Sequence, residues 1–349
     1  MTGKARTRFL AASVLSLAMA GAALAQSSVE QFYKGRSVPI LVGFAPGGVN
    51  DISARLVARH LPRFVPGAPN FVVQNQPSAG GLAVANNMYN AAPKDGSVIA
   101  GLDRGSPQLA IQGEPEAKYD PLKFTWLGSI SSYAEDAYLL LVTEKSRAKS
   151  AADLRVGPPI KLGAVSAGSS NLVFATVAKD ILNLNIDIIR GYTGAAPMFL
   201  AMQSGELDGQ VVGLSSTRAG QPDLWARKAV KPLIQFGRTT RLPELADVPT
   251  GRELAASDEA RALIAFAELP FFMALPFIAP PGIPEDRAKA LQNGFTQMMK
   301  DKDFVAEAVK LGLDVSPVGP DGLVELLSRS AATPKDVIAK YNAIVSPTK

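Results

Sequence analysis

The sequence predicts an α/β protein with two domains. Short apolar runs of strand length alternate with helix-length amphipathic segments, and this order is typical of a parallel sheet with crossover helices. The chain has 349 residues, a length that favours two domains over one. Hydrophobic residues make up 47% of the chain and charged residues 19%, the balance of a protein that buries a core.

The N-terminus has the three parts of a secretory signal peptide. Lys4, Arg6 and Arg8 form a basic start, residues 9–20 are an apolar stretch, and a small-x-small cleavage site ends at Ala25. The apolar stretch is shorter than the roughly 20 residues of a membrane-spanning helix. We therefore expect cleavage after Ala25 and an exported mature protein. A buried N-terminal helix is the alternative.

The first part of the mature chain predicts three strands and two helices. Pro62 ends the first helix, because proline cannot continue the hydrogen-bond ladder of a helix interior. The strands are expected at 38–44, 71–74 and 97–102, and the helices at 51–61 and 82–91.

The remainder of the chain repeats the pattern after a connector, 111–126, that fits no element. Residues 214–216 are expected to form a loop. Strands are expected at 137–143, 161–165, 186–189 and 210–212, and helices at 151–154, 172–182, 196–204, 284–300, 303–311 and 334–345.

Composition excludes several kinds of chemistry. Without cysteine the chain has no disulfide, no thiolate nucleophile and no lipid-modified cysteine. His60 is the only histidine, so no multi-histidine metal site exists, and we expect no cofactor and no metal. Removal of residues 1–25 reduces the net charge from +5 to +2, and no basic run remains to bind nucleic acid.

The loops after the predicted strands are rich in glycine, serine, alanine and asparagine. Ligands of open α/β sheets bind beyond the carboxyl ends of the strands, where loops lead into helices. Backbone amides at a helix N-terminus favour an anion. The sequence therefore predicts an anion-binding cleft built mostly from main chain, although glycines that serve only as turns are the simpler alternative.

Five motifs follow one another along the mature chain. They are F-A-P-G-G-V-N-D at 44–51, N-Q-P-S-A-G-G at 75–81, P-K-D-G at 93–96, G-Y-T-G at 191–194 with S-G-E-L-D at 204–208, and A-P-P-G-I-P at 279–284. In this order they resemble the motifs of the Bug family of tripartite tricarboxylate transporter receptors, which are extracytoplasmic solute-binding proteins.

This resemblance implies a two-domain, periplasmic-binding-protein-like (Venus flytrap) α/β fold with two chain crossovers. It divides the mature chain into domain I, at 26–140 plus 268–349, and domain II, at 141–267. It implies a small organic carboxylate in the interdomain cleft, with a dicarboxylate favoured. It also implies delivery of this ligand to integral-membrane transporter subunits, and we expect the receptor to be a monomer.

The resemblance also implies which loops hold the ligand. Arg104 is added because an arginine after the third strand can bind a second carboxylate bidentately. Ser78 stands where the family usually has glycine. The implied ligand residues of the first domain are Gly47, Gly48, Val49, Asn50, Asp51, Ser78, Ala79 and Gly80, and those of the second are Ala167, Gly168, Ser169, Ser170, Thr193 and Ser215.

Several residues keep a structural alternative. Asp51 can contact the ligand, fix the helix start by pairing with Arg55, or do both. Arg104 can be a solvated charge at a strand end. His60 is expected to be a helix residue rather than a catalytic base.

Two other functions are weighed against the receptor. A secreted serine-type hydrolase would use Ser169 or Ser215, but it would have only His60 as a histidine base, and no G-x-S-x-G motif occurs. A sensor that presents its ligand to a signalling receptor has the same sequence features as a transport receptor. The sequence does not specify which carboxylate is bound.

Overall fold

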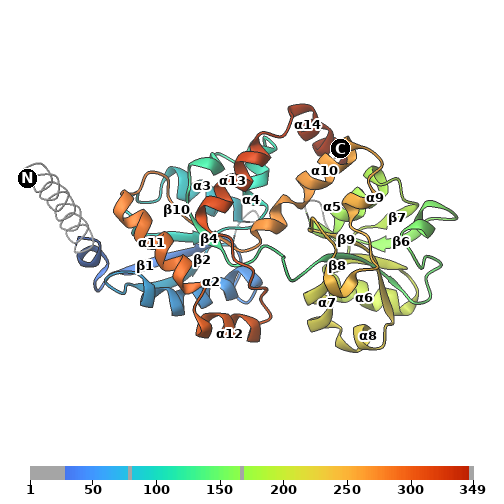
Figure 1. Ribbon diagram of the computed structural model, residues 1–349, viewed down its shortest axis with the longest axis horizontal. Coiled ribbons are helices and arrows are strands. Elements are labelled where there is room, and N and C mark those ends of the chain that lie inside the picture. The colour runs from blue at the N-terminus through green and yellow to red at the C-terminus, as the bar shows by residue number, and fades with distance from the viewer. Residues whose placement is uncertain (1–27, 78–80, 166–168, 346–349) are drawn as a thin grey trace, which may run out of the picture. The chain divides into compact units, whose positions relative to one another are not determined.

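The structure, a computed structural model, describes residues 28–77, 81–165 and 169–345 (Figure 1). The expected signal peptide lies outside these ranges, as do Ser78, Ala79, Gly80, Ala167 and Gly168 of the predicted site. Within the described ranges the chain forms two compact units, and each contains one five-stranded sheet.

The sheet of unit 1 combines three parallel strands with an antiparallel insertion. β1 pairs in parallel with both β2 and β3, and β10 lies antiparallel between β3 and β4. The order is β2-β1-β3-β10-β4, formed by β1 (Ser37–Val42), β2 (Asn70–Asn75), β3 (Ile99–Gly101), β4 (Thr125–Ser129) and β10 (Pro276–Ala279).

Helices follow the parallel strands of unit 1 because the chain must return to the same edge of the sheet before the next parallel strand. α2 buries Leu56 and Val57 and has Asp51 in its first turn. The unit contains α2 (Val49–His60), α3 (Leu82–Asn90), α11 (Glu285–Met298), α12 (Lys302–Lys310) and the 3₁₀ turns Leu61–Phe64 and Pro121–Lys123.

Unit 2 repeats the sheet plan of unit 1. β6 pairs in parallel with β7 and β8, and β5 lies antiparallel between β8 and β9. The order is β7-β6-β8-β5-β9, formed by β5 (Tyr138–Thr143), β6 (Ile160–Gly163), β7 (Ile186–Ile189), β8 (Gly209–Gly213) and β9 (Val230–Phe236).

The core of unit 2 joins its sheet to helices from the middle and the end of the chain. Phe174, Phe236 and Phe271 pack in one buried cluster with Tyr341 of the C-terminal helix. The helices are α5 (Ser170–Thr176), which continues as the π-helix Val177–Ile181, α6 (Ala195–Ser204), α7 (Leu214–Gly220), α8 (Pro222–Ala226), α9 (Gly251–Leu254), α10 (Asp258–Glu268), α13 (Pro320–Ala331) and α14 (Lys335–Val345), with 3₁₀ turns at Ala152–Arg155, Pro243–Leu245 and Leu269–Met273.

Each unit is built from several segments of the chain, because the chain passes from one unit to the other more than once. Unit 1 holds the described residues up to Ser106 together with Glu116–Ser129 and Leu275–Leu311, and unit 2 holds the rest. This division differs from the predicted one, which assigned 268–349 to the first domain. The packing of α14 in the core of unit 2 explains the difference, because the ring of Tyr341 lies 5.0 Å from that of Phe266.

Most predicted elements are confirmed, with ends that shift by a few residues. The prediction of a loop at 214–216 is wrong, because these residues begin helix α7. The unassigned connector contains a 3₁₀ turn and the start of β4. The prediction omitted β4, β9, β10, α4 (Ser106–Ile111), α8, α9, α10 and α13.

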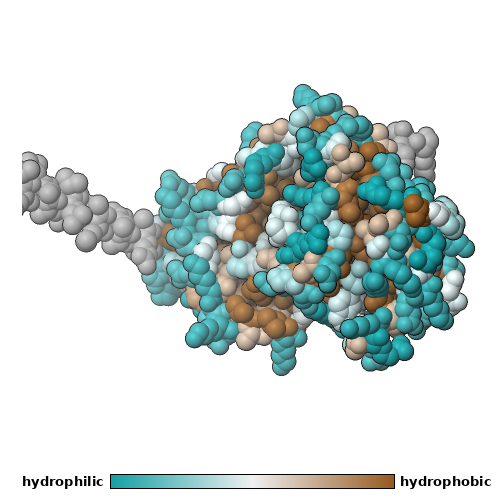
Figure 2. Space-filling model, turned by 45° about the vertical axis from the view of Figure 1, so that its right-hand side comes forward, coloured by the Kyte–Doolittle hydropathy of each residue, from teal (hydrophilic) through white to brown (hydrophobic). Residues whose placement is uncertain are grey.

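The surface of the described part of the chain is mixed in polarity. Hydrophilic residues cover much of the face in Figure 2, with hydrophobic patches between them. Among the described residues, no helix combines the length and the apolar character that crossing a bilayer requires.

Candidate ligand-binding loops

Those predicted ligand residues of unit 1 that the structure describes lie at one edge of its sheet. Val42, the last residue of β1, is in register with Asn75 at the end of β2 and with Gly101 at the end of β3. Because these strands are parallel, the loops that follow them leave the sheet on the same side. The structure thus brings the loop at 43–48 together with the loop that contains Arg104.

Two glycines, Gly43 and Gly81, determine how closely the first two glycine-rich loops approach each other. A β-carbon on Gly43 would lie 2.3 Å from the Cα of Gly81, so the two backbones pack with no room for a side chain. Gly81 has a φ of +87° and faces the ring of Phe44 and the Cβ of Asp103. The second glycine-rich motif therefore ends against the first, and both lie beside the loop after β3.

Asp51 fixes the shape of the first loop from within helix α2. Its Oδ2 accepts hydrogen bonds from the amide of Gly47 at 2.8 Å and from Nε of Arg55 at 3.0 Å. Its Oδ1 accepts one at 2.9 Å from Nδ2 of Asn75, which also donates to the carbonyl of Phe44 at 3.0 Å. Both carboxylate oxygens are therefore engaged by the protein.

The electrostatics of Asp51 agree with this anchoring role. The residue is 2% exposed. Burial raises the pKa of Asp51, but the hydrogen bonds from Arg55, Gly47 and Asn75 outweigh burial and hold the pKa below its ordinary value. Of the alternatives weighed from the sequence, the contacts support the one in which Asp51 shapes the loop.

The residues before Asp51 present their main chain to solvent. Gly47 and Gly48 are exposed, and Val49 is 52% exposed. Gly48 is the N-cap of α2 in an extended conformation, and no atom lies within 4 Å of the position of a β-carbon there. The first amides of an α-helix have no partner inside the helix, so this loop offers donors suited to an anion.

The loop after β3 contains a half-buried acid, Asp103, that the sequence analysis did not select. Asp103 accepts a hydrogen bond from the amide of Gly105 at 2.8 Å. Burial raises the pKa of Asp103, and the charge of Arg104 and the neighbouring amides oppose the rise. Arg104 is therefore one half of a local pair of opposite charges.

The described members of the predicted site in unit 2 also lie at one edge of a sheet. Gly163, at the end of β6, is in register with Ile189 of β7 and Gln210 of β8, and all three strands are parallel. The loops that follow contain Ser169 and Thr193, and Ser215 lies in the first turn of α7. The same strand-to-helix arrangement therefore occurs in both units.

Side chains in the loops of unit 2 are tied to their neighbours. Asn171 Oδ1 accepts hydrogen bonds from the hydroxyl of Ser169 at 2.8 Å and from the amide of Val165 at 3.2 Å. In the G-Y-T-G motif, the hydroxyl of Tyr192 donates to Glu206 at 2.6 Å, which joins this motif to the S-G-E-L-D motif. Thr193 is exposed.

Ser215 is held by an acid from a distant part of the chain. Its hydroxyl donates to Asp136 Oδ2, and its amide donates to Asp136 Oδ1 at 3.1 Å. Ser170 is the first residue of α5 and is half-buried. The hydroxyls of both candidate nucleophiles, Ser169 and Ser215, thus point to an amide oxygen and a carboxylate rather than to an imidazole.

His60 lies in the other unit. Its Nε2 is 2.6 Å from Oε2 of Glu307 on α12, and its ring packs edge-on against Phe304. These contacts agree with the prediction that His60 is a helix residue. Among the described residues, no group of three or more histidine, cysteine, aspartate or glutamate side chains is arranged to hold a metal ion.

The chain matches known proteins over most of its length. Residues 54–343 match the family described as the tripartite tricarboxylate transporter family receptor, TctC. A UPF0065 protein from the tcbD-tcbE intergenic region of Pseudomonas sp. strain P51 is 24% identical over 347 residues, which cover 96% of this chain and 94% of that protein.

Three solved structures share the fold. A TctC solute-binding protein from Polaromonas has a TM-score of 0.67 and 17% identity, with 88% of this chain and 99% of that chain covered. MatC from Rhodopseudomonas palustris, with bound malate, has a TM-score of 0.58 and 22% identity, with 87% and 99% covered. Rpa4515 from R. palustris, with adipate, has a TM-score of 0.59 and 22% identity, with 89% and 98% covered.

These similarities confirm the two-domain, periplasmic-binding-protein-like α/β fold that the sequence predicts. The family match covers far more than half of the chain. The chain therefore belongs to the tripartite tricarboxylate transporter receptor family, whose members are periplasmic solute-binding proteins.

Proposed function

We propose that this protein is a periplasmic receptor that binds a small organic dicarboxylate and delivers it to integral-membrane transporter subunits. Membership of the receptor family supports binding rather than catalysis. The signal-peptide pattern of the first 25 residues supports export. We further propose that the ligand contacts are those predicted from the sequence, with Asp51 contributing its backbone amide and not its carboxylate.

The observation that carries this proposal is the loop from Gly47 to Asp51. The carboxylate of Asp51 accepts a hydrogen bond from the amide of Gly47 and pairs with Arg55. Because Arg55 offsets its negative charge and both contacts lie within the loop and helix, the carboxylate does not repel an anionic ligand. The amide of Gly47 is used by Asp51, so the donors that remain are those of the exposed Gly48 and of the first residues of α2. A preorganised loop at a helix N-terminus binds a carboxylate with little ordering cost.

A dicarboxylate is favoured over a monocarboxylate for two reasons. Two proteins of the same fold were solved with the dicarboxylates malate and adipate. In this chain, Arg104 follows β3 at the same sheet edge as the anion loop, and a guanidinium can bind a second carboxylate bidentately. The amides of the loop would then hold one carboxylate, and Arg104 the other.

A thermal-shift panel tests this proposal. The panel contains mono-, di- and tricarboxylates, with diols of the same chain length as uncharged controls. A ligand at 100 times its dissociation constant stabilises the folded state by about 2.7 kcal/mol, so a bound dicarboxylate raises the unfolding temperature and its diol does not. If no acid in the panel shifts the transition, the receptor proposal is wrong.

The panel is repeated with Arg104→Gln. We expect dicarboxylates to lose more of their stabilisation than monocarboxylates do, because only dicarboxylates have a second charge for the guanidinium. An equal loss of stabilisation for both classes would mean that Arg104 does not bind the second carboxylate. Esters of the binding acids are assayed in parallel, and turnover that disappears in Ser215→Ala would favour the hydrolase instead.

A further inference from the structure

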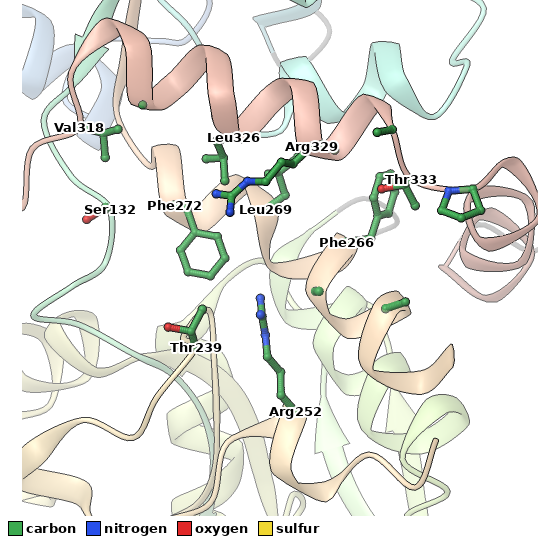
Figure 3. A pocket seen from close by; sticks show the side chains of 16 residues that line it. Ser132, Thr239, Arg252, Phe266, Leu269, Phe272, Val318, Leu326, Arg329 and Thr333 are labelled. Atoms are coloured by element: carbon green, nitrogen blue, oxygen red, sulfur yellow. The ribbon is translucent and has the colours of Figure 1, made fainter. Parts of the chain in front are cut away.

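Unit 2 contains a pocket of about 680 Å³ whose described lining includes none of the predicted ligand residues. Figure 3 shows it between α13, α10, the 3₁₀ turn that follows α10, and α9. Every residue that lines it belongs to unit 2. Its volume falls within the range of pockets that enclose small organic ligands, roughly 300–1,000 Å³.

The pocket is mainly apolar. Its walls include the side chains of Phe266, Leu269 and Phe272 from α10 and the turn after it. Val318, just before α13, and Leu326, on α13, form another part of the wall. Phe272 points into the middle of the view in Figure 3. This lining favours a ligand with an apolar body, because apolar surface removed from water on both partners stabilises the complex.

Arg252 brings a positive charge to the pocket from α9. Its Nε donates to Oε2 of the fully buried Glu268 at 2.5 Å. Among the described residues, this is its one hydrogen-bonded partner, and Figure 3 shows its guanidinium group pointing into the pocket. Burial raises the pKa of Glu268 to about 7, although Arg252 opposes the rise, so this acid offsets the arginine only in part near neutral pH.

Arg329 brings a second positive charge from α13 on the opposite wall (Figure 3). Its acidic neighbour is Glu325, with Nε and Oε1 4.0 Å apart and both side chains about 70% exposed, a geometry that contributes little. The described residues that line the pocket include these two arginines and no acid. The two guanidinium groups come from opposite walls of the pocket, so an anion between them is attracted by both.

A buried hydroxyl adds a polar contact to the same wall. Ser330 is 6% exposed, and its Oγ has no hydrogen-bond partner among the described residues. An unsatisfied buried hydroxyl costs free energy that a ligand oxygen can recover. The pocket therefore combines a large apolar lining, two cations and a buried hydroxyl.

We propose that this pocket is a second ligand site, specific for an amphipathic organic monoanion such as a medium-chain or aryl-substituted carboxylate. The apolar body would lie against Phe266, Leu269 and Phe272, and the carboxylate between Arg252 and Arg329. This site is separate from the proposed dicarboxylate loops, because the two share none of the residues that the structure describes.

Isothermal titration with octanoate tests the site, with 1-octanol as the uncharged control of the same chain length. We expect saturable one-to-one binding of octanoate by the full mature protein, and binding of octanol at least about tenfold weaker. Arg329→Gln should weaken octanoate binding at least about tenfold, because a charge-assisted hydrogen bond is lost. Ala332→Phe, at an exposed position in the lining, should also weaken it by filling the space.

Arg261→Gln is the matched control, since Arg261 is an exposed arginine of α10 that pairs with Asp258 and does not line the pocket. It should leave octanoate binding unchanged, as should Gly48→Val in the proposed dicarboxylate loop. Absence of saturable octanoate binding overturns the proposal. So does equal binding by Arg329→Gln and Arg261→Gln, or equal affinity for octanoate and octanol. Loss of octanoate binding in Gly48→Val would place octanoate in the dicarboxylate loops and also overturn the proposal.

Discussion

Asp51 joins three segments of unit 1 through one carboxylate. It receives hydrogen bonds from Gly47 in the loop, Arg55 one turn later in α2, and Asn75 at the end of β2. The pairing with Arg55 could be predicted from the four-residue spacing. The bond from Asn75 could not, because it depends on the pairing of β1 with β2, which brings the end of one strand next to the loop of the other.

Asp51→Asn should destabilise unit 1. We expect a loss of about 1–3 kcal/mol in the free energy of unfolding at pH 7, because hydrogen bonds to a buried charge are replaced by weaker neutral ones. The pKa of Asp51 lies below its ordinary value of 3.8 in the folded protein. Ionised Asp51 therefore stabilises the fold above that value, and this contribution is lost as the pH falls through the lower, folded-state pKa.

Urea unfolding at several pH values measures this effect. The difference between wild type and Asp51→Asn should stay constant from pH 8 to pH 5 and shrink only below pH 4. Asp258→Asn is the control, because the side chain of Asp258 is 97% exposed. A difference no larger than that of the control at pH 7 would contradict the anchoring role of Asp51.

The start of helix α7 could not be predicted from the local sequence. Ser215 and Ser216 favour caps and turns over helix interiors, and the sequence predicts a loop at 214–216. In the structure, Asp136 accepts the amide and the hydroxyl of Ser215 and so satisfies the first turn of the helix. The partner lies 79 residues earlier in the chain, so a local pattern cannot reveal it.

Strand β10 could not be predicted from the sequence for a different reason. The run from Leu269 to Pro281 contains four prolines and has no period that identifies a strand. The four-residue strand Pro276–Ala279 exists because it completes the sheet between β3 and β4. Regular amphipathic helices such as α11 and α14 can be predicted, because their apolar residues recur with the helical period in the local sequence.

Gly43 sets the distance between the first two glycine-rich loops. A β-carbon there would lie 2.3 Å from the Cα of Gly81 and would push the two backbones apart. Gly43→Ala should therefore lower the free energy of unfolding by about 1–3 kcal/mol, as overpacking does in a tight core. Gly220→Ala is the control, because no atom lies within 4 Å of a β-carbon at that position.

Urea unfolding of the two glycine variants gives the comparison. We expect a lower midpoint for Gly43→Ala and no loss for Gly220→Ala, which places alanine in the last residue of α7. Equal midpoints would mean that the close approach of the two loops is not required for stability. Binding of the dicarboxylate by Gly43→Ala should also weaken, since the loop geometry changes.

At the scale of the whole chain, the two units share one plan. In each, three parallel strands lead into helices at one sheet edge, and the fourth strand in the order is antiparallel. In both units the chain enters this antiparallel strand after it has crossed from the other unit. β4 of unit 1 is followed by β5 of unit 2, and β9 of unit 2 is followed by β10 of unit 1. The sequence predicts the repeated strand-loop-helix order, whereas the return of α13 and α14 to unit 2 emerges only from the packing.

The central claim is that the exposed main chain at the start of α2 binds a dicarboxylate. Gly48 and Gly319 form a matched pair for testing it. Both are N-caps in the same extended conformation, with φ and ψ of −80° and 169° for Gly48 and −75° and 172° for Gly319, and neither has an atom within 4 Å of a β-carbon position. Valine should therefore be tolerated equally by the fold at both positions.

Isothermal titration of a dicarboxylate series that includes malate and adipate into wild type, Gly48→Val and Gly319→Val tests the claim most directly. We predict one-to-one binding of at least one acid by wild type and Gly319→Val, and an affinity at least about tenfold weaker for Gly48→Val, because the added side chain occupies the space where the carboxylate meets the backbone. Failure of every acid to bind wild type, or equal affinities for the two variants, would contradict it.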